Sequence, residues 1–227
     1  MDEVVKRLGR LDCCAVSDAM DKLGLKSRVA SGLQQHATTR RIVGRAVTYR
    51  LVPADQVPTG TGAPRHLGTT AIDTASPGDV IVVEQRTGID AGSWGGILTL
   101  GAKVKGIAGV VADGPVRDID EARAYDFPVY CRALTARTAR GRVAEIECNG
   151  PVTIGEVTVQ PGDYVIADAS GVAFVPAADA ARVLDAAEAI ADREAAMAKA
   201  LLAGKPITEV MGADYEHMLH QPHKELR

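Results

Sequence analysis

The residues best suited to chemistry lie in one stretch, 92–118. It opens with Gly92-Ser93-Trp94-Gly95-Gly96 and then takes on helical spacing. The backbone N–H groups of Gly95, Gly96, Ile97 and Leu98 would therefore begin a helix, where they favour an anion. The stretch closes with Arg117-Asp118, an Arg that can grip a carboxylate through two hydrogen bonds and an Asp that can hold a hard divalent cation. Together these groups predict a site for a small 2-oxo acid, with the amides and Arg117 on its carboxylate and a metal ion on its 2-oxo group.

These groups meet only if the surrounding elements bring both ends of the stretch together. Apolar runs and helical spacing alternate here, which predicts strands at 80–84, 107–112 and 127–132 and helices over 97–105 and 117–125. A β-α-β-α-β block has a partly parallel sheet, and its loops gather at the sheet edge where ligands bind. The spacing alone leaves a second interpretation open, in which the glycines form turns and Arg117-Asp118 is an ion pair at the start of a helix.

The whole chain of 227 residues predicts one α/β domain, with a tail from about 205 to 227. A short helix over 2–10 precedes a second helix that Asp12 can cap and Gly24 can end. A strand covers 42–51, and residues 53–70, rich in Pro, Gly and Thr, predict a long loop. Short antiparallel strands follow within 151–175. An Ala-rich helix over 178–203 closes the domain, and its apolar face carries Val183, Ala187, Ile190, Ala191 and Leu201.

Composition and charge exclude several classes of protein. Net charge is −3 and aromatic residues make up 4%, so neither electrostatic capture nor base stacking favours a nucleic-acid partner. No apolar run is long enough to span a bilayer, and the acidic start Met1-Asp2-Glu3 is unlike a secretory signal. The four cysteines (Cys13, Cys14, Cys131 and Cys148) form no C-x-x-C pair. We therefore expect reduced thiols and a cytoplasmic location.

The chain resembles the class II pyruvate aldolases that cleave 4-hydroxy-4-methyl-2-oxoglutarate and 4-carboxy-4-hydroxy-2-oxoadipate, a family that also holds the regulator of ribonuclease E activity A. The most specific match is the run Gly-Val-Val-Ala-Asp-Gly-Pro-Val-Arg-Asp, which ends at Asp118. The resemblance extends over most of the chain, including Val16-Ser17-Asp18-Ala19, Pro77-Gly78-Asp79-Val80, Phe127-Pro128-Val129, Val159-Gln160-Pro161-Gly162-Asp163 and Asp168-Ala169-Ser170-Gly171-Val172. It implies a compact β/β/α swivelling domain that assembles into trimers or pairs of trimers, with sites at subunit interfaces.

The resemblance also implies roles for single residues. Arg117 matches the Arg that binds the pyruvate carboxylate or enolate, and Asp118 matches the Asp that anchors Mg²⁺ or Mn²⁺. The amides near Ile97 and Leu98 match further pyruvate contacts. The family's aldolases have an acid at the position of Gly96, so this sequence departs from the pattern there. A neighbouring subunit supplies a Glu in the family, and Glu194 is its nearest match, although a solvated helix charge fits Glu194 equally well.

The departure at Gly96 bears on the reaction. The family activity is a metal-dependent retro-aldol cleavage through a pyruvate enolate, and the same enolate forms when oxaloacetate loses CO₂. Decarboxylation has no 4-hydroxyl to deprotonate, so it should tolerate the missing acid better than aldol cleavage does. Two alternatives remain: a different enolate or carbanion reaction on another substrate, and a non-catalytic protein-binding regulator.

Other polar residues are weaker candidates. Asp113 could be a further acid near the site, although Asp-Gly-Pro chemistry favours a turn there. Lys103 and Lys105 look solvated, which argues against a Schiff base. His36 and His66 are isolated. His217, His220 and His223 recur every three residues and could bind adventitious metal, but a polar tail is the stronger interpretation.

Overall fold

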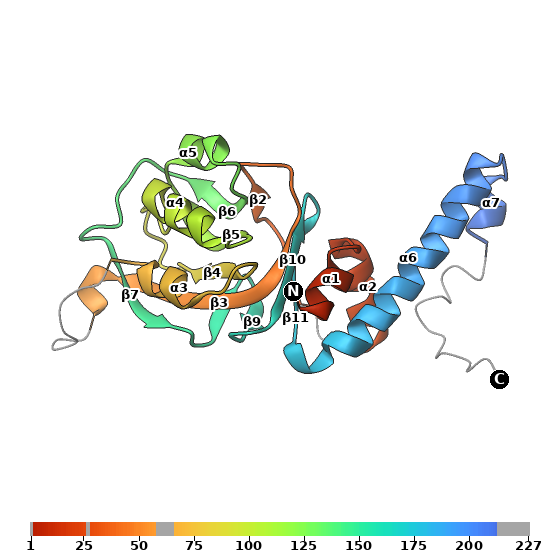
Figure 1. Cartoon of the computed structure of the whole chain (residues 1–227), viewed down its shortest axis with the longest axis horizontal. Helices are drawn as coiled ribbons and strands as arrows, with labels where there is room; N and C mark the ends of the chain where they lie inside the picture. Colours follow the sequence, from red (N-terminus) through yellow and green to blue (C-terminus); the bar gives the residue numbers. More distant parts are fainter. Residues whose placement is uncertain (1, 26–27, 58–65, 213–227) are drawn as a thin grey trace.

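The computed structural model describes residues 2–25, 28–57 and 66–212 (Figure 1). The helices are α1 (Glu3–Leu8), α2 (Cys13–Lys22), α3 (Thr69–Thr74), α4 (Gly96–Lys105), α5 (Ile119–Ala124), α6 (Ala180–Leu202) and α7 (Ile207–Val210), with 3-10 turns η1 (Ala54–Gln56) and η2 (Ala177–Asp179). The strands are β1 (Val29–Ala30), β2 (Gln34–Gln35), β3 (Ile42–Pro53), β4 (Val80–Glu84), β5 (Gly109–Val116), β6 (Val129–Leu134), β7 (Val143–Cys148), β8 (Val152–Ile154), β9 (Val157–Val159), β10 (Tyr164–Asp168) and β11 (Gly171–Val175).

The main sheet is mixed, as the sequence predicts. Its path runs β1-β11-β10-β3-β4-β5-β6-β2, and β7 pairs with β3 beside that path. The four strands from β3 to β6 are parallel, whereas β1, β2, β7, β10 and β11 pair antiparallel with their neighbours. The predicted β-α-β-α-β block is therefore confirmed as β4-α4-β5-α5-β6. Residues Val80 to Val83 of the central β4 are fully buried, as expected of a parallel strand covered on both faces.

The helices form two groups (Figure 1). One group, α3, α4 and α5, packs on the parallel strands around a core that includes Tyr49, Trp94 and Phe127. The other, α1, α2 and α6, packs on β10 and β11 around Met20, Leu184 and their neighbours. A further core lies around Phe174 and the β8–β9 hairpin. The two helix groups lie at opposite ends of the molecule, and α6 continues away from the sheet.

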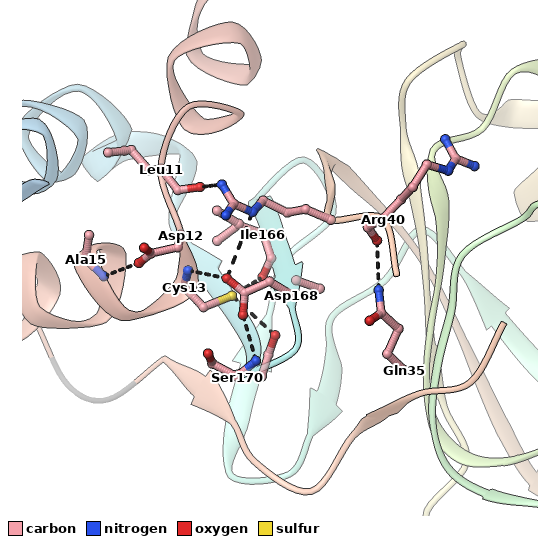
Figure 2. A network of polar contacts seen from close by, with 12 residues as sticks. Leu11, Asp12, Cys13, Ala15, Gln35, Arg40, Ile166, Asp168 and Ser170 are labelled. Atoms are coloured by element: carbon pink, nitrogen blue, oxygen red, sulfur yellow. Dashed lines mark hydrogen bonds and ion pairs between the residues drawn. The ribbon is translucent and has the colours of Figure 1, made fainter. Parts of the chain in front are cut away.

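A polar network fastens α2 to the β10–β11 hairpin (Figure 2). Asp12 caps the helix as predicted, accepting the Ala15 N–H at 2.8 Å. The Asp168 carboxylate accepts the N–H groups of Cys13 at 2.9 Å and Ser170 at 2.8 Å. The Cys13 thiol contacts the Ile166 carbonyl at 3.3 Å, and burial raises the pKa of this thiol to about 12. Cys13 is therefore a buried structural thiol, and all four cysteines are free.

The Ala-rich helix is confirmed as α6, but its apolar face is only half covered. Val183, Ala187 and Ile190 are buried, as predicted. The prediction that Leu201 is buried with them is wrong within one subunit. Leu201 is 37% exposed, because it lies beyond the half of α6 that packs on the domain. The helix ends before Gly204, whose φ of +87° is the left-handed conformation that glycine adopts easily.

Three other features differ from the sequence prediction. Strand β5 does not close at Ala112 but continues to Val116, with a shift in its pairing to β6 between Ala112 and Pro115. Strand β7 was not predicted, nor was α3, which begins at the end of the expected 53–70 loop. Residues 58–65 of that loop lie outside the described residues. In the described part of the chain, no helix has both the length and the apolar character needed to cross a membrane.

Candidate active site

The glycine loop before α4 is bonded to the end of β5. The N–H and the hydroxyl of Ser93 both donate to the Pro115 carbonyl at 2.8 Å, and the Arg117 N–H donates to the Trp94 carbonyl at 3.0 Å. Trp94 is buried, stacks on Phe127 with 6.4 Å between ring centroids, and donates its indole N–H to the Thr99 hydroxyl at 2.8 Å. The two ends of the 92–118 stretch thus lie together at one edge of the sheet.

Asp118 joins that edge to the start of α4. It caps α5 in the left-handed region at φ 58°, a conformation that Asp tolerates better than most residues. Its Oδ2 accepts the Gly96 N–H at 3.0 Å. The Nε of Arg117 lies 3.2 Å from both Asp118 oxygens. The second interpretation of the sequence, an Arg–Asp ion pair at the start of a helix, is therefore also present in the structure.

Two glycines leave room for these side chains. A Cβ on Gly92 would lie 2.8 Å from the Arg117 Cγ, and one on Gly95 would lie 2.9 Å from the Asp118 Oδ2. We expected glycine here to let a ligand approach the backbone. In the structure, the side chains that approach Gly92 and Gly95 most closely are those of Arg117 and Asp118.

The glycine loop, the first turn of α4 and the pair Arg117-Asp118 together form one corner of the molecule. Several hydrogen-bond donors remain open at this corner. The N–H groups of Ile97 and Leu98 belong to the first turn of α4, which no side chain caps at Gly95. Arg117 donates from Nε to Asp118, and among the described residues no acceptor meets its Nη groups. A pocket of about 250 Å³ adjoins Arg117 and is lined by Val116, Arg117, Asp118, Ile119, Leu134, Thr135 and Ala136. Open amides and a half-buried guanidinium are groups that bind a carboxylate.

Glu121 was not expected from the sequence. It lies in the first turn of α5, and its carboxylate covers Gly96: a Cβ on Gly96 would lie 1.8 Å from the Glu121 Oε2. The available signal was its spacing of three from Asp118, which puts both residues on one side of a helical turn. In the described residues, no group of three or more His, Cys, Asp or Glu could hold a metal ion. Two carboxylates still fit Mg²⁺ or Mn²⁺, because Mg²⁺ keeps several waters and needs only one or two protein carboxylates.

Asp113 and Glu194 do not join this corner in one subunit. Asp113 lies within β5 rather than in a turn, because β5 continues past Ala112. Its buried carboxylate pairs with Arg132 and accepts the Gly155 N–H at 2.7 Å. Glu194 lies on the exposed half of α6, at the opposite end of the molecule from α5 (Figure 1). Partial burial, then Asp12 and Asp18, raise the pKa of Glu194.

The weaker candidates lie elsewhere or are occupied. Lys103 is exposed and donates to the Asp126 carbonyl at 3.3 Å, and Lys105 donates to the Asp73 carbonyl, so neither is a desolvated amine. His66 is exposed, and the residues from His217 onward lie outside the described residues. A second pocket, of about 490 Å³, is lined by Val5, Lys6, Gly9, Arg10, Arg41 and Val43 and contains no acidic side chain.

This mixed α/β fold agrees with the comparisons to known proteins. Residues 13–174 match the family model described as RraA-like, Aldolase/RraA. The chain belongs to this family. That membership confirms the resemblance that the sequence showed.

Individual relatives are similar over most of this chain. A Halalkalibacterium halodurans protein named "Putative 4-hydroxy-4-methyl-2-oxoglutarate aldolase" is 32% identical over 76% of this chain and 76% of its own length. Protein DlpA of Legionella pneumophila is 30% identical over 78% of this chain, but the match spans only 28% of DlpA. The crystal structure of Streptomyces coelicolor RraAS2, titled an unusual member of the RNase ES inhibitor RraA family, superposes with a TM-score of 0.73 at 27% identity, covering 86% of this chain and 94% of that one.

Proposed function

We propose that the protein is a divalent-metal-dependent carbon–carbon lyase that acts on a small 2-oxo acid through a pyruvate enolate. The observation that carries the proposal is the bonded pair of Arg117 and Asp118, which lines a pocket and is joined through the Asp118 carboxylate to the uncapped first turn of α4. Its relatives named as 4-hydroxy-4-methyl-2-oxoglutarate aldolases support the same reaction class.

Each residue of the corner has a distinct task in this proposal. The Nη groups of Arg117 bind the substrate carboxylate, and the Ile97 and Leu98 amides donate to oxygens that gain negative charge. Asp118 orients Arg117 through its Nε and offers carboxylate oxygen to Mg²⁺ or Mn²⁺. When bound, such a cation supplies Lewis-acid polarisation of a 2-oxo group. The Gly96 N–H and the Arg117 Nε hold the Asp118 carboxylate in a fixed orientation.

Two substrates share the required chemistry. Retro-aldol cleavage of a 4-hydroxy-2-oxo acid needs a base for the 4-hydroxyl, whereas decarboxylation of oxaloacetate does not. Residue 96 is a glycine and cannot act as that base. We therefore expect oxaloacetate decarboxylation to be the faster of the two reactions.

Assembly would complete the site. Three apolar side chains at helical spacing are exposed on α4: Ile97 at 80%, Leu100 at 38% and Val104 at 81%. A stripe of this kind beside the pocket favours a homo-oligomer, a trimer or hexamer, with each site close to a subunit interface. In such an assembly Glu194 of a neighbouring copy could reach a site that it cannot reach within its own subunit.

The test is pyruvate release, measured by coupling to lactate dehydrogenase. 4-Hydroxy-4-methyl-2-oxoglutarate and oxaloacetate are offered separately, each with Mg²⁺ or Mn²⁺ and each with an EDTA control. Release that exceeds the metal-only background and is lost in EDTA supports the lyase. No release from either substrate, by protein that is folded and oligomeric, would contradict it.

A protein-binding regulator is the second candidate, favoured by the glycine at position 96 and by the RNase-inhibitor title of one structural relative. A regulator has no need for an Arg and Asp held this tightly at a pocket. Absence of pyruvate release together with inhibition of an RNase E-type ribonuclease would select this candidate.

A further inference from the structure

Glu121 and Gly96 are packed as a complementary pair. A Cβ on Gly96 would lie 1.8 Å from the Oε2, 2.5 Å from the Cδ and 2.9 Å from the Oε1 of Glu121. The carboxylate therefore rests against the Gly96 Cα and occupies the space where any other side chain at position 96 would begin. The Asp118 carboxylate accepts the N–H of the same glycine.

The backbone gives no other reason for glycine at this position. Gly96 is the first residue of α4, and it is absent from the glycines that adopt a positive φ. Glycine in a helix is less favourable than alanine because it loses more conformational freedom on folding. The absence of a side chain at Gly96 is what lets the exposed Glu121 carboxylate approach the start of α4 this closely.

The Glu121 carboxylate has no cationic partner in the described residues. The nearest basic groups along the chain are committed elsewhere, Arg117 to Asp118 and Arg123 to Asp120. Two carboxylates therefore lie against one glycine, and the ion pair of Arg117 is with Asp118. Asp118 also lines the pocket, and Glu121 lies against the first residue of α4.

We propose that Glu121 is the second carboxylate of the divalent-cation site at Asp118, and that the glycine at 96 lets the Glu121 carboxylate approach this site. The proposal rests on the metal site of the proposed function. An acid carried by α5 then supplies the cation-holding part of the role that an acid at residue 96 of α4 would have, either binding the cation directly or holding its waters. No proton transfer to the substrate is assigned to Glu121. Hard oxygen ligands on adjacent helix starts suit Mg²⁺ or Mn²⁺.

The test is Mn²⁺ binding to the full chain, followed by electron paramagnetic resonance of the free ion and by calorimetry. Glu121→Gln keeps the size of the side chain and removes its charge, and Asp118→Asn does the same for the first carboxylate. Asp120→Asn is the matched control, because Asp120 lies on the same turn of α5 and its side chain is 92% exposed. We expect Glu121→Gln to weaken Mn²⁺ binding about tenfold or more, as for other residues that support a metal site, and Asp120→Asn to leave it nearly unchanged.

A relocation experiment gives a second readout. Glu121→Ala should weaken Mn²⁺ binding, and Gly96→Asp added to it should restore much of the affinity, because the acid then returns from the α4 side. Gly96→Asp alone should not strengthen binding, since its side chain would collide with the Glu121 carboxylate.

Each outcome decides a separate statement. If Asp118→Asn abolishes Mn²⁺ binding while Glu121→Gln matches Asp120→Asn, the role of Glu121 is wrong and the metal site of the proposed function stands. If Glu121→Gln lowers only the thermal stability, Glu121 is a helix-start contact and not a cation ligand. If the wild-type protein binds no Mn²⁺, the metal site itself is wrong. Pyruvate release measured in EDTA then tells whether the protein catalyses the reaction without a metal ion.

Discussion

The Asp118 carboxylate accepts the Gly96 N–H over 3.0 Å, although the two residues are 22 positions apart in the chain. This bond connects the end of β5 to the start of α4 and fixes the carboxylate that also orients Arg117. The corner is therefore held by backbone groups as well as by an ion pair. Small changes in the glycine loop should therefore alter the rate of the proposed reaction by moving the Asp118 carboxylate.

Replacing Gly95 with alanine should impair the reaction more than the fold. The new Cβ would lie 2.9 Å from the Asp118 Oδ2, so the carboxylate must move away from Gly96 and Arg117. We expect pyruvate release to fall by a factor of about ten to a hundred, because displacements of about 1 Å at a reacting site have effects of this size. Steady-state kinetics and thermal unfolding of the same variant measure the two effects separately.

Gly101→Ala is the matched control within α4. Nothing lies within 4 Å of a Cβ at this position, and an alanine in a helix interior should stabilise the protein by roughly 0.5–1 kcal/mol. Unchanged kinetics are expected for this variant. Equal losses of activity in Gly95→Ala and Gly101→Ala would mean that the contact with Asp118 is not what Gly95 protects.

Asp168→Asn should destabilise the protein at neutral pH by about 1–3 kcal/mol, since it weakens charge-assisted bonds from two backbone N–H groups (Figure 2). Burial by itself raises the pKa of Asp168, but the N–H groups of Cys13 and Ser170 outweigh it, and the net pKa lies below 3.8. A lowered folded-state pKa stabilises the protein above the unfolded-state pKa and loses that contribution as the pH falls through the folded-state value.

The difference between wild type and Asp168→Asn should therefore be constant near neutral pH and shrink below about pH 4, as follows from the linkage of protonation and folding. Urea unfolding at several pH values measures it. Asp120→Asn, at a position that is 92% exposed and forms only a surface ion pair with Arg123 among the described residues, should change stability by less than about 0.5 kcal/mol. A difference that grew on acidification would contradict the bonding assigned to Asp168.

Val104→Glu should weaken the proposed assembly. It places a charge in the exposed apolar stripe of α4, where a subunit interface would have to bury it without a partner. We expect light scattering after size exclusion to show a trimer or hexamer for the wild type and smaller species for the variant. Gln56→Glu adds the same charge at an exposed position outside α4 and should leave the mass unchanged. A monomeric wild type, or an unaffected Val104→Glu, would show that α4 is not an interface.

Local pattern predicts much of this fold, because the buried parallel strands are continuous apolar runs. Val80 to Val83 can be assigned from the sequence for that reason, and the helix starting at Gly96 follows from its spacing and the glycines before it. Strand β7 escapes prediction because its residues alternate with charges and only Val143 is buried. Asp113 was misplaced because Asp-Gly-Pro is ordinary turn chemistry, whereas the pairing shift inside β5 absorbs it within a strand.

The candidate site divides in the same way. Arg117 and Asp118 can be singled out from residue type and position after a strand, and the structure places them beside the start of α4 as the topology requires. Glu121 cannot be found like this, since its contact with Gly96 depends on how closely α5 packs against α4. The place of Glu194 depends on a second copy of the chain, which one sequence does not specify.

In the proposed function, one corner of the molecule, built on Arg117, carries the reaction. The most direct measurement is pyruvate release by Arg117→Ala beside the wild type, at saturating Mn²⁺ and on the better of the two substrates. We expect a loss of about a hundredfold or more in kcat/KM, the scale seen when a donor to developing negative charge is removed. Thermal stability should change little, because Arg117 is only half-buried. Pyruvate release at the wild-type rate by folded Arg117→Ala would place the reaction elsewhere and contradict the proposed function.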